Sequence, residues 1–271
     1  MGVTNQTTAI MATHLFIDLN TDLGERPHAL LDNSEAQIIS MISSANIACG
    51  GHAGDESTMA QALVLCRRYG LGLGAHPSFP DRINFGRSEM PMTAHELTDC
   101  VFEQVRALGR IAKSQGCELQ HVKPHGALYN LAAKNKRIAE AIALGVARWS
   151  GDLILVGLAH SAMLEVWQAM GFRVVAEGFV DRVYEADGTL RSRAHKDALI
   201  HSPESACAQA LRIIKGRGVR AYDGTIVPVQ AETLCIHSDT ANALALLKAL
   251  RAKLEQENIS IVAFSKKKGS A

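Results

Sequence analysis

The feature that most constrains the fold of this chain is an alternation of short aliphatic runs with longer helical patterns. Such an order predicts parallel strands joined by crossover helices, because parallel neighbours need a long connection between them. The predicted strands are Leu15–Leu19, Ala45–Ala48, Leu71–Ala75, Leu119–Lys123, Leu153–Gly157, Arg173–Ala176, Leu234–His237 and, as an eighth candidate, Ile259–Phe264.

Helix boundaries between these runs carry residues that satisfy free backbone N–H groups. Thr93 with Glu96 forms a capping box, and Ser202 before Pro203 combines an N-cap with a proline in the first turn. The predicted helices run from Asn33-Ser34 to about Ser43, from Asp55 to Gly70, from Thr93 to Gly116, from Ser202 to about Lys215, and from after Asp239 through Leu250. The polar segment Phe179–Lys196 has no clean periodicity, which is typical of a hairpin or lid.

The length of 271 residues and the 47% hydrophobic content indicate one large α/β domain with an aliphatic core. No linker and no internal repeat divides the sequence, so a single domain over 1–271 is expected. Flexible tails are expected at 1–13 and 265–271, the second of which contains a short lysine run.

Charge and cysteine usage narrow the class of partner and the compartment. The formal net charge of +1 gives no overall attraction to nucleic acid or anionic lipid, so a small neutral or zwitterionic molecule is the expected partner. The six cysteines are scattered without a C-x-x-C pair and are expected to be reduced thiols. No signal peptide or membrane span is evident, and a cytoplasmic location is therefore expected.

Polar side chains recur at the carboxyl ends of the predicted strands, where parallel α/β folds place their sites. A lone histidine is more often structural than catalytic, but repeated costly polar groups at one mouth favour a site. Those singled out in the sequence are Asp18, Asn20, Asp22, Asn46, Gly51, His52, His76, Lys123, His125, Glu177, Asp181, Arg182, His237 and Asp239.

Two alternatives stay open for the histidines. His52 and His76 can bind a divalent metal ion together with Asp18 and Asp22, or they can make hydrogen bonds that orient the substrate or the carboxylates. Their spacing differs from the H-E-x-x-H metal motif.

Lys123 and His125 alternate on one strand and can both face the mouth. Lys123 can hold a substrate carboxylate or phosphate, or form a salt bridge to Asp18 or Glu177. His125 can transfer protons.

No nucleotide-binding fingerprint occurs in the sequence. Gly50, Gly51 and Gly54 permit a tight turn before a helix, yet they match neither a Walker loop nor the dinucleotide pattern. Any nucleotide is therefore expected to be bound largely by a partner. Cys49 is interpreted as a packing residue.

Seven segments together resemble one known family, LamB/YcsF, also described as the A subunit of 5-oxoprolinase or as lactam utilization protein. They are DLNTDLGE (18–25), ANIACGGHAGD (45–55), GAHPSFPD (74–81), FGR (85–87), HVKPHGALYN (121–130), AEGFVDRVY (176–184) and CIHSD (235–239). The resemblance covers about residues 15 to 250. It implies a distorted seven-stranded parallel (β/α) barrel like those of the glycoside hydrolase/deacetylase superfamily. It also implies ATP-dependent conversion of 5-oxo-L-proline to L-glutamate together with B and C subunits.

That reaction assigns expected roles to the polar residues. The residues expected at the reacting centre are Asp18, His52, His76, Lys123, His125, Glu177 and Asp239. Those expected to bind substrate are Asn20, Asp22, Asn46, Gly51, Arg87, Arg182 and His237. Asp18 or Glu177 would be the general base, His125 the proton donor, and Lys123 or Arg182 the charge partner of a carboxylate or phosphate.

The sequence departs from the family pattern in two places. Residues Ser192–Ala198 differ from the expected proline-glycine turn, and Ser238 stands where glycine is usual. Two other functions stay open: a metal-dependent deacetylase or amidohydrolase acting on a carbohydrate or another lactam, and a non-catalytic protein that binds a small acid.

Overall fold

The computed structural model describes residues 15–26, 34–240 and 242–266. The predicted N-terminal tail and the Asn33 cap lie outside this part of the chain, as do residues 267–271 of the predicted C-terminal tail. Ser265 and Lys266, also assigned to that tail, instead belong to a short 3-10 helix, η1 (Phe264–Lys266).

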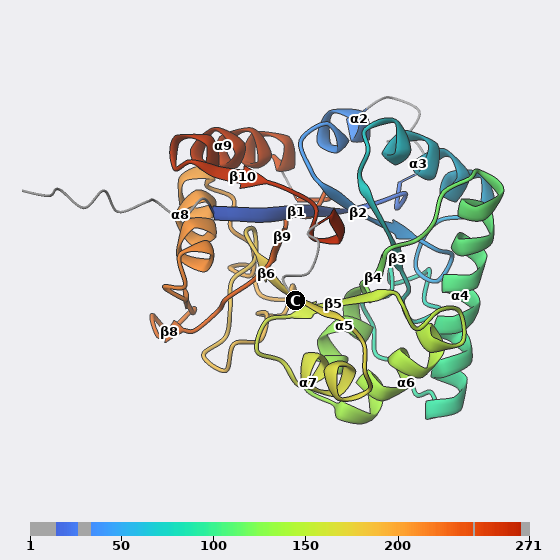
Figure 1. The fold of residues 1–271 in the computed structure, drawn as a ribbon. Coiled ribbons are helices and arrows are strands. Elements are labelled where there is room, and N and C mark those ends of the chain that lie inside the picture. Colours follow the sequence, from blue (N-terminus) through green and yellow to red (C-terminus); the bar gives the residue numbers. More distant parts are fainter. Residues whose placement is uncertain (1–14, 27–33, 241, 267–271) are drawn as a thin grey trace, which may run out of the picture.

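Seven parallel strands close into a barrel, as the family resemblance implied (Figure 1). In order around the barrel they are β1 (Leu15–Leu23), β2 (Ser44–Ala48), β3 (Gly72–His76), β4 (His121–Val122), β5 (Ile154–Leu158), β6 (Val174–Phe179) and β9 (Thr233–Cys235). The ring closes because β9 pairs with both β6 and β1. An additional strand, β10 (Ile259–Ile261), pairs with the start of β1 at Leu15–Ile17.

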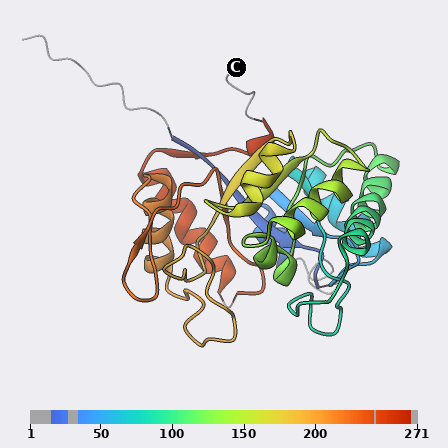
Figure 2. The same cartoon turned by 90° about the horizontal axis from the view of Figure 1, so that it is seen from below.

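Helices surround the strands, and Figure 2 shows them on both sides of the barrel. They are α2 (Ser34–Ile39), α3 (Glu56–Arg68), α4 (Ala94–Ser114), α5 (Gly126–Ala132), α6 (Lys136–Ala147), α7 (Ala162–Ala169), α8 (Pro203–Ile214) and α9 (Ala243–Gln256). The aliphatic core of buried side chains fills the space between helices and strands. Among the described residues, no helix combines the length and the apolar composition needed to cross a membrane.

Strand β1 shows how the sequence separates core from site. Its residues alternate, so that Ile17, Leu19 and Leu23 join the apolar core while Asp18 and Asp22 lie among polar side chains. The polar residues therefore occupy the inside of the barrel at successive depths.

The predicted elements are confirmed in order and type, with differences at their ends. The capping box of Thr93 and Glu96 and the N-cap of Ser202 are both present. Helix α2 ends at Ile39 rather than near Ser43, whose hydroxyl bonds the backbone oxygen of Leu19. Helix α9 extends beyond Leu250 to Gln256. Two short antiparallel strands, β7 (Val219–Arg220) and β8 (Ile226–Val227), were not predicted.

The polar segment Phe179–Lys196 begins a hairpin-like loop, as predicted. Isolated bridges join Arg182 to Leu199 and Tyr184 to Leu190. Tyr184 anchors the loop, because its buried hydroxyl accepts a hydrogen bond from the backbone N–H of Phe179 at 2.8 Å. The loop contributes part of the wall of the cavity described next.

Candidate active site at the carboxyl ends of the strands

A cavity of about 440 Å³ opens where the strands end, within the range of roughly 300–1,000 Å³ that is usual for small-ligand sites. Loops after β3, β4, β6 and β9 form it, as expected for a parallel barrel. Among its lining residues are Asp22, His76, Arg87, Lys123, His125, Tyr129, Phe179, Arg182, Arg193 and His237.

Lys123 lies at the centre of a buried polar network beneath this cavity. Its Nζ atom is 3.0 Å from Asp22 Oδ1, 3.1 Å from Glu177 Oε1 and 3.2 Å from Cys235 Sγ. Burial alone would lower the pKa of Lys123, but the carboxylate charges outweigh it and hold this pKa well above the ordinary value. Lys123 is therefore a charged residue whose charge is already balanced by protein groups.

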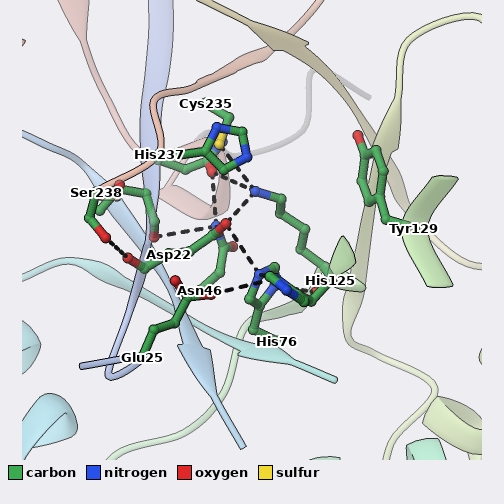
Figure 3. Close-up of polar contacts among 12 residues, drawn as sticks. Asp22, Glu25, Asn46, His76, His125, Tyr129, Cys235, His237 and Ser238 are labelled. Atoms are coloured by element: carbon green, nitrogen blue, oxygen red, sulfur yellow. Dashed lines mark hydrogen bonds and ion pairs between the residues drawn. The ribbon is translucent and has the colours of Figure 1, made fainter. Parts of the chain in front are cut away.

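The carboxylates around Lys123 are themselves held by neutral donors. Asn20 Nδ2 donates to Glu177 Oε1 at 3.0 Å, and the Tyr129 hydroxyl donates to Glu177 Oε2 at 2.7 Å. Asn46 Nδ2 donates to Asp22 Oδ1 at 2.9 Å. Burial would raise the pKa of Asp22, but the charges of His76 and Lys123 hold it well below the ordinary value. Figure 3 shows Asp22 and Asn46 pointing toward the same centre.

Asp18 lies away from this centre, at the level where β1 pairs with the first residues of β2 and β9. Its carboxylate accepts hydrogen bonds from Ser43 at 2.6 Å, from Ser44 at 2.8 Å and from Thr233. Burial raises its pKa to about 6. The structure therefore places Asp18 outside the cavity lining and outside the group of histidines, where its expected roles as general base and metal ligand would be performed. Each step of two residues along a strand moves a side chain by about 6–7 Å, which separates Asp18 from Asp22.

A histidine–carboxylate pair faces the cavity from the loops after β6 and β9. His237 Nδ1 lies 3.0 Å from Asp181 Oδ2, and the buried Asp181 also accepts from the backbone N–H of His237. Burial would raise the pKa of Asp181, but the charge and hydrogen bonds of His237 hold it well below the ordinary value. Because Asp181 accepts a hydrogen bond from Nδ1, the neutral His237 ring carries its lone pair on Nε2. That arrangement suits proton transfer.

Arg182 is a buried cation on the cavity wall without a carboxylate partner. Among the described residues, none places a carboxylate within ion-pair distance of Arg182, and its Nε atom has no hydrogen-bond partner. One Nη donates to the backbone oxygen of Arg191 at 2.6 Å. Burial, with the nearby charge of Arg193, lowers the pKa of Arg182 to about 10. Such a guanidinium is suited to bind an anion from the cavity.

Three histidines and one glutamate form a second group, on the side of the cavity near β3. The four residues are Glu25, His52, His76 and His125. Nε2 of His52 is 3.0 Å from Glu25 Oε1, and Nε2 of His76 is 3.0 Å from Nδ1 of His125. Nε2 of His76 is also 3.2 Å from Asp22 Oδ2. In Figure 3, His76 and His125 lie next to each other below Asp22. This group shares His52 and His76 with the ligand set expected from sequence, but it contains Glu25 and His125 where Asp18 and Asp22 were expected.

Asp239 lies at the rim rather than at the reacting centre where it was expected. Its carboxylate pairs with Arg87 at 2.5 Å and with Arg193 at 3.2 Å. These contacts join three loops, including the altered segment Ser192–Ala198. The other departure, Ser238, donates its hydroxyl hydrogen to the backbone oxygen of Asp22 at 3.1 Å.

Gly51 does not line the cavity. A Cβ atom at this position would lie 2.3 Å from Gln104 Oε1 and 2.4 Å from Ser78 Oγ, so a larger residue would displace the buried Gln104 amide, which accepts a hydrogen bond from the backbone N–H of Ser78. Cys49 is buried, and burial raises its pKa to about 12, which agrees with a packing role.

Sequence reasoning thus found most of the polar groups but missed Glu25, Tyr129 and Arg193, and gave Asp181 no role. Glu25 and Tyr129 stand inside the segments DLNTDLGE and HVKPHGALYN, so the signal was proximity to strand ends. Arg193 lies in the loop that crosses toward Asp239, and no local pattern marks it.

Comparison with known proteins identifies relatives along nearly the whole described chain. The LamB/YcsF family model matches residues 17–269. The A subunit of 5-oxoprolinase from Chloroflexus aggregans is 49% identical over 247 residues, which cover 91% of this chain and 98% of that protein. The corresponding A subunit from Bordetella pertussis is 46% identical with the same coverage. The crystal structure of a lactam utilization protein from Thermus thermophilus superposes with a TM-score of 0.84 at 40% identity, covering 92% of this chain and all of that one.

Proposed function

Because the chain belongs to the LamB/YcsF family, we propose that it is the A subunit of an ATP-dependent 5-oxoprolinase that converts 5-oxo-L-proline to L-glutamate with B and C subunits. The observation that carries this proposal is the buried guanidinium of Arg182 on the cavity wall, which has no carboxylate partner among the described residues. A small lactam that bears a carboxylate supplies such a partner, and the charged contact would orient its ring.

In this proposal, His237 acts first as the general base and then as the general acid. Its Nε2 accepts a proton from the attacking water and returns one to the ring nitrogen as the lactam C–N bond breaks. Asp181 holds the ring in the required tautomer, and Lys123 with its carboxylates forms a charge-balanced network below the substrate. His125, the donor expected from sequence, has its Nε2 bonded to the backbone oxygen of Phe85 at 2.9 Å, and its Nδ1 lies 3.0 Å from His76 Nε2.

ATP makes the unreactive amide carbon electrophilic. Transfer of the γ-phosphoryl group to the lactam oxygen, with loss of the ring N–H proton to solvent, gives an imidoyl phosphate and ADP, and water then adds to the same carbon. Cleavage of the C–N bond leaves an acyl phosphate, which a second water hydrolyses to glutamate and phosphate. Since this sequence lacks a nucleotide-binding fingerprint, the partner subunits are proposed to bind most of the ATP.

The test is glutamate formation from 5-oxoproline by the chain with candidate B and C subunits, with and without ATP. Glutamate is expected only when partners and ATP are both present. Arg182→Met should raise KM for 5-oxoproline about 10- to 100-fold, the value of a charged hydrogen-bonded contact. Arg110→Met, at an exposed position of α4, is the matched control and should leave KM unchanged. Glutamate formation without ATP, or an unchanged KM in Arg182→Met, contradicts the proposal.

A metal-dependent hydrolase of another amide is the second candidate, and the group of Glu25 and three histidines favours it. A metal ion can polarise an amide carbonyl without a phosphoryl donor. Turnover that EDTA abolishes and that needs neither ATP nor partner subunits would select this candidate.

A further inference from the structure

We propose that Glu25, His52, His76 and His125 bind one divalent transition-metal ion, for which Zn²⁺ is the best match. Three imidazole nitrogens and one carboxylate oxygen form a donor set typical of zinc. This inference goes beyond the proposed function, because the site would exist whichever amide the cavity accepts.

The spacing of the four donor atoms fits a metal ion. All four lie within 4.8 Å of one another. Glu25 Oε1 is 3.0 Å from His52 Nε2 and 3.5 Å from His125 Nδ1, and His125 Nδ1 is 3.0 Å from His76 Nε2. Tetrahedral bonds of about 2.0–2.1 Å to zinc place neighbouring donors roughly 3.4 Å apart.

The backbone fixes which nitrogen of each central ring can bind. His76 Nδ1 donates to the backbone oxygen of Lys123 at 2.7 Å, and His125 Nε2 donates to that of Phe85 at 2.9 Å. A carbonyl oxygen only accepts, so in the neutral rings the two nitrogens that face each other both carry lone pairs. Two lone pairs at 3.0 Å repel unless a cation lies between them, and a carbonyl behind the ring is a common outer partner of metal-binding histidines.

The loop that supplies the Phe85 carbonyl is held in an uncommon conformation. Phe85 has φ of 57°, in the left-handed region that non-glycine residues rarely adopt. The loop also packs closely on the histidines, since a Cβ atom at Gly86 would lie 2.9 Å from His52 Cβ and 3.0 Å from His125 Cδ2. This strained contact orients His125 and supports a positioned ligand.

Burial gives a further reason for a bound cation. His52 and His76 are 2% and 1% exposed, and the rings of His52 and His125 stack with centroids 3.7 Å apart. Buried polar groups are costly unless they are paired or bind a metal. The other candidate group, Asp22, Cys235 and His237, is less suitable, because the Lys123 ammonium already contacts both Asp22 and Cys235.

The ion would lie at the wall of the cavity, because His76 and His125 are among the residues that line it. A metal in that place supplies Lewis-acid polarisation of a substrate oxygen or of water.

The experiment is a titration of the full-length, EDTA-treated chain with Co²⁺, followed by its visible absorption, and with Zn²⁺ by calorimetry. One ion per chain is expected. His52→Ala and His76→Gln should each weaken binding by about 100-fold or more, since even outer-shell changes weaken metal sites 10- to 100-fold. His95→Ala is the control and should bind as the wild type does, because His95 is 85% exposed on α4.

Thermal unfolding with and without Zn²⁺ keeps the test independent of catalysis and of misfolding. Zn²⁺ should raise the Tm of the wild type and of His95→Ala, but not that of the folded His52→Ala or His76→Gln variants. A wild type that binds neither ion, or cluster variants that bind as tightly as the wild type, overturns the site. Glutamate formation is not used as a readout, so loss of the proposed function would leave this result unaffected.

Discussion

Two regions inside the barrel, the floor around Asp18 and the mouth around Arg182, His76 and His125, are built from the same kinds of polar residue. They differ in how completely those residues are paired. At the floor, the Asp18 carboxylate accepts hydrogen bonds from three hydroxyl groups, and Asp18 does not line the cavity. At the mouth, Arg182 lacks a carboxylate partner, and His76 Nε2 and His125 Nδ1 face each other at 3.0 Å. A buried polar group that the protein leaves incompletely paired indicates a ligand, whereas a saturated one indicates structure.

The largest effect on stability is expected where the two regions meet, at Lys123. Lys123→Met leaves the buried carboxylates of Asp22 and Glu177 without their cation, which should lower the free energy of unfolding by about 3–5 kcal/mol. Urea denaturation measures this. Lys248→Met, at an exposed position of α9, should change it by less than about 0.5 kcal/mol. A Lys123→Met protein that is as stable as this control would show that the ion pairs of Lys123 do not stabilise the fold.

The next largest effect is expected on kcat and comes from His237 at the mouth. His237→Asn should reduce kcat in the reconstituted assembly by about 10²–10⁴-fold, the usual contribution of a proton-transferring residue. KM for 5-oxoproline should change far less. Asp181→Asn should also lower kcat, because it removes the acceptor that fixes the His237 tautomer. Steady-state kinetics of the wild type and the two variants measures kcat and KM separately. A change confined to KM would show that His237 binds the substrate but does not transfer a proton.

At the floor, the expected effect is a pH dependence of stability that comes from Asp18, and not a change in catalysis. The Asp18 pKa is raised to about 6 in the folded chain, above the ordinary 3.8, so the folded state binds this proton more tightly. The resulting stabilisation is present below about pH 4 and is lost as pH rises through about 6. At about 1.4 kcal/mol per pKa unit the loss is about 3 kcal/mol.

Comparison with Asp18→Asn isolates this contribution, because the amide does not ionise. Relative to wild type, the variant should gain about 3 kcal/mol of unfolding free energy between pH 4 and pH 7. Denaturant unfolding at both pH values tests it. An equal pH dependence in the two proteins would mean that Asp18 is ionised as readily in the fold as in the unfolded chain.

The smallest effect is expected at the rim, where Asp239 joins Arg87 and Arg193. These groups are partly exposed, and such ion pairs contribute about 1 kcal/mol or less. Asp239→Asn should therefore leave the Tm nearly unchanged while raising KM a few-fold, because Arg193 on the cavity wall loses its anchor. A loss of kcat as large as that of His237→Asn would show that Asp239 acts in the reaction itself.

Much of the fold could be predicted from sequence because strand and helix patterns are local. The seven barrel strands occur where the aliphatic runs predicted them, and Thr93 with Glu96 starts α4 as expected. The short antiparallel hairpin of β7 and β8, which lies outside the barrel, was not predicted.

Depth within the barrel could not be predicted. Alternation correctly put Asp18 and Asp22 on the inner face, but strand stagger decides which of them reaches the mouth, and that stagger depends on pairing with distant strands. Glu25 lies beyond the end of β1, after the left-handed turn at Gly24 with φ of 71°, so strand alternation cannot place it. The direction of Asp239 likewise depends on arginines 46 and 152 residues away.

Glutamate formation in the reconstituted assembly with ATP, compared between Asp18→Asn and His237→Asn, distinguishes a mouth that reacts from a floor that supports the fold. Asp18→Asn should retain the wild-type kcat at pH 7, while His237→Asn should lose at least about 100-fold. Two folded variants with equal losses, or a greater loss in Asp18→Asn, would rule out this division of roles.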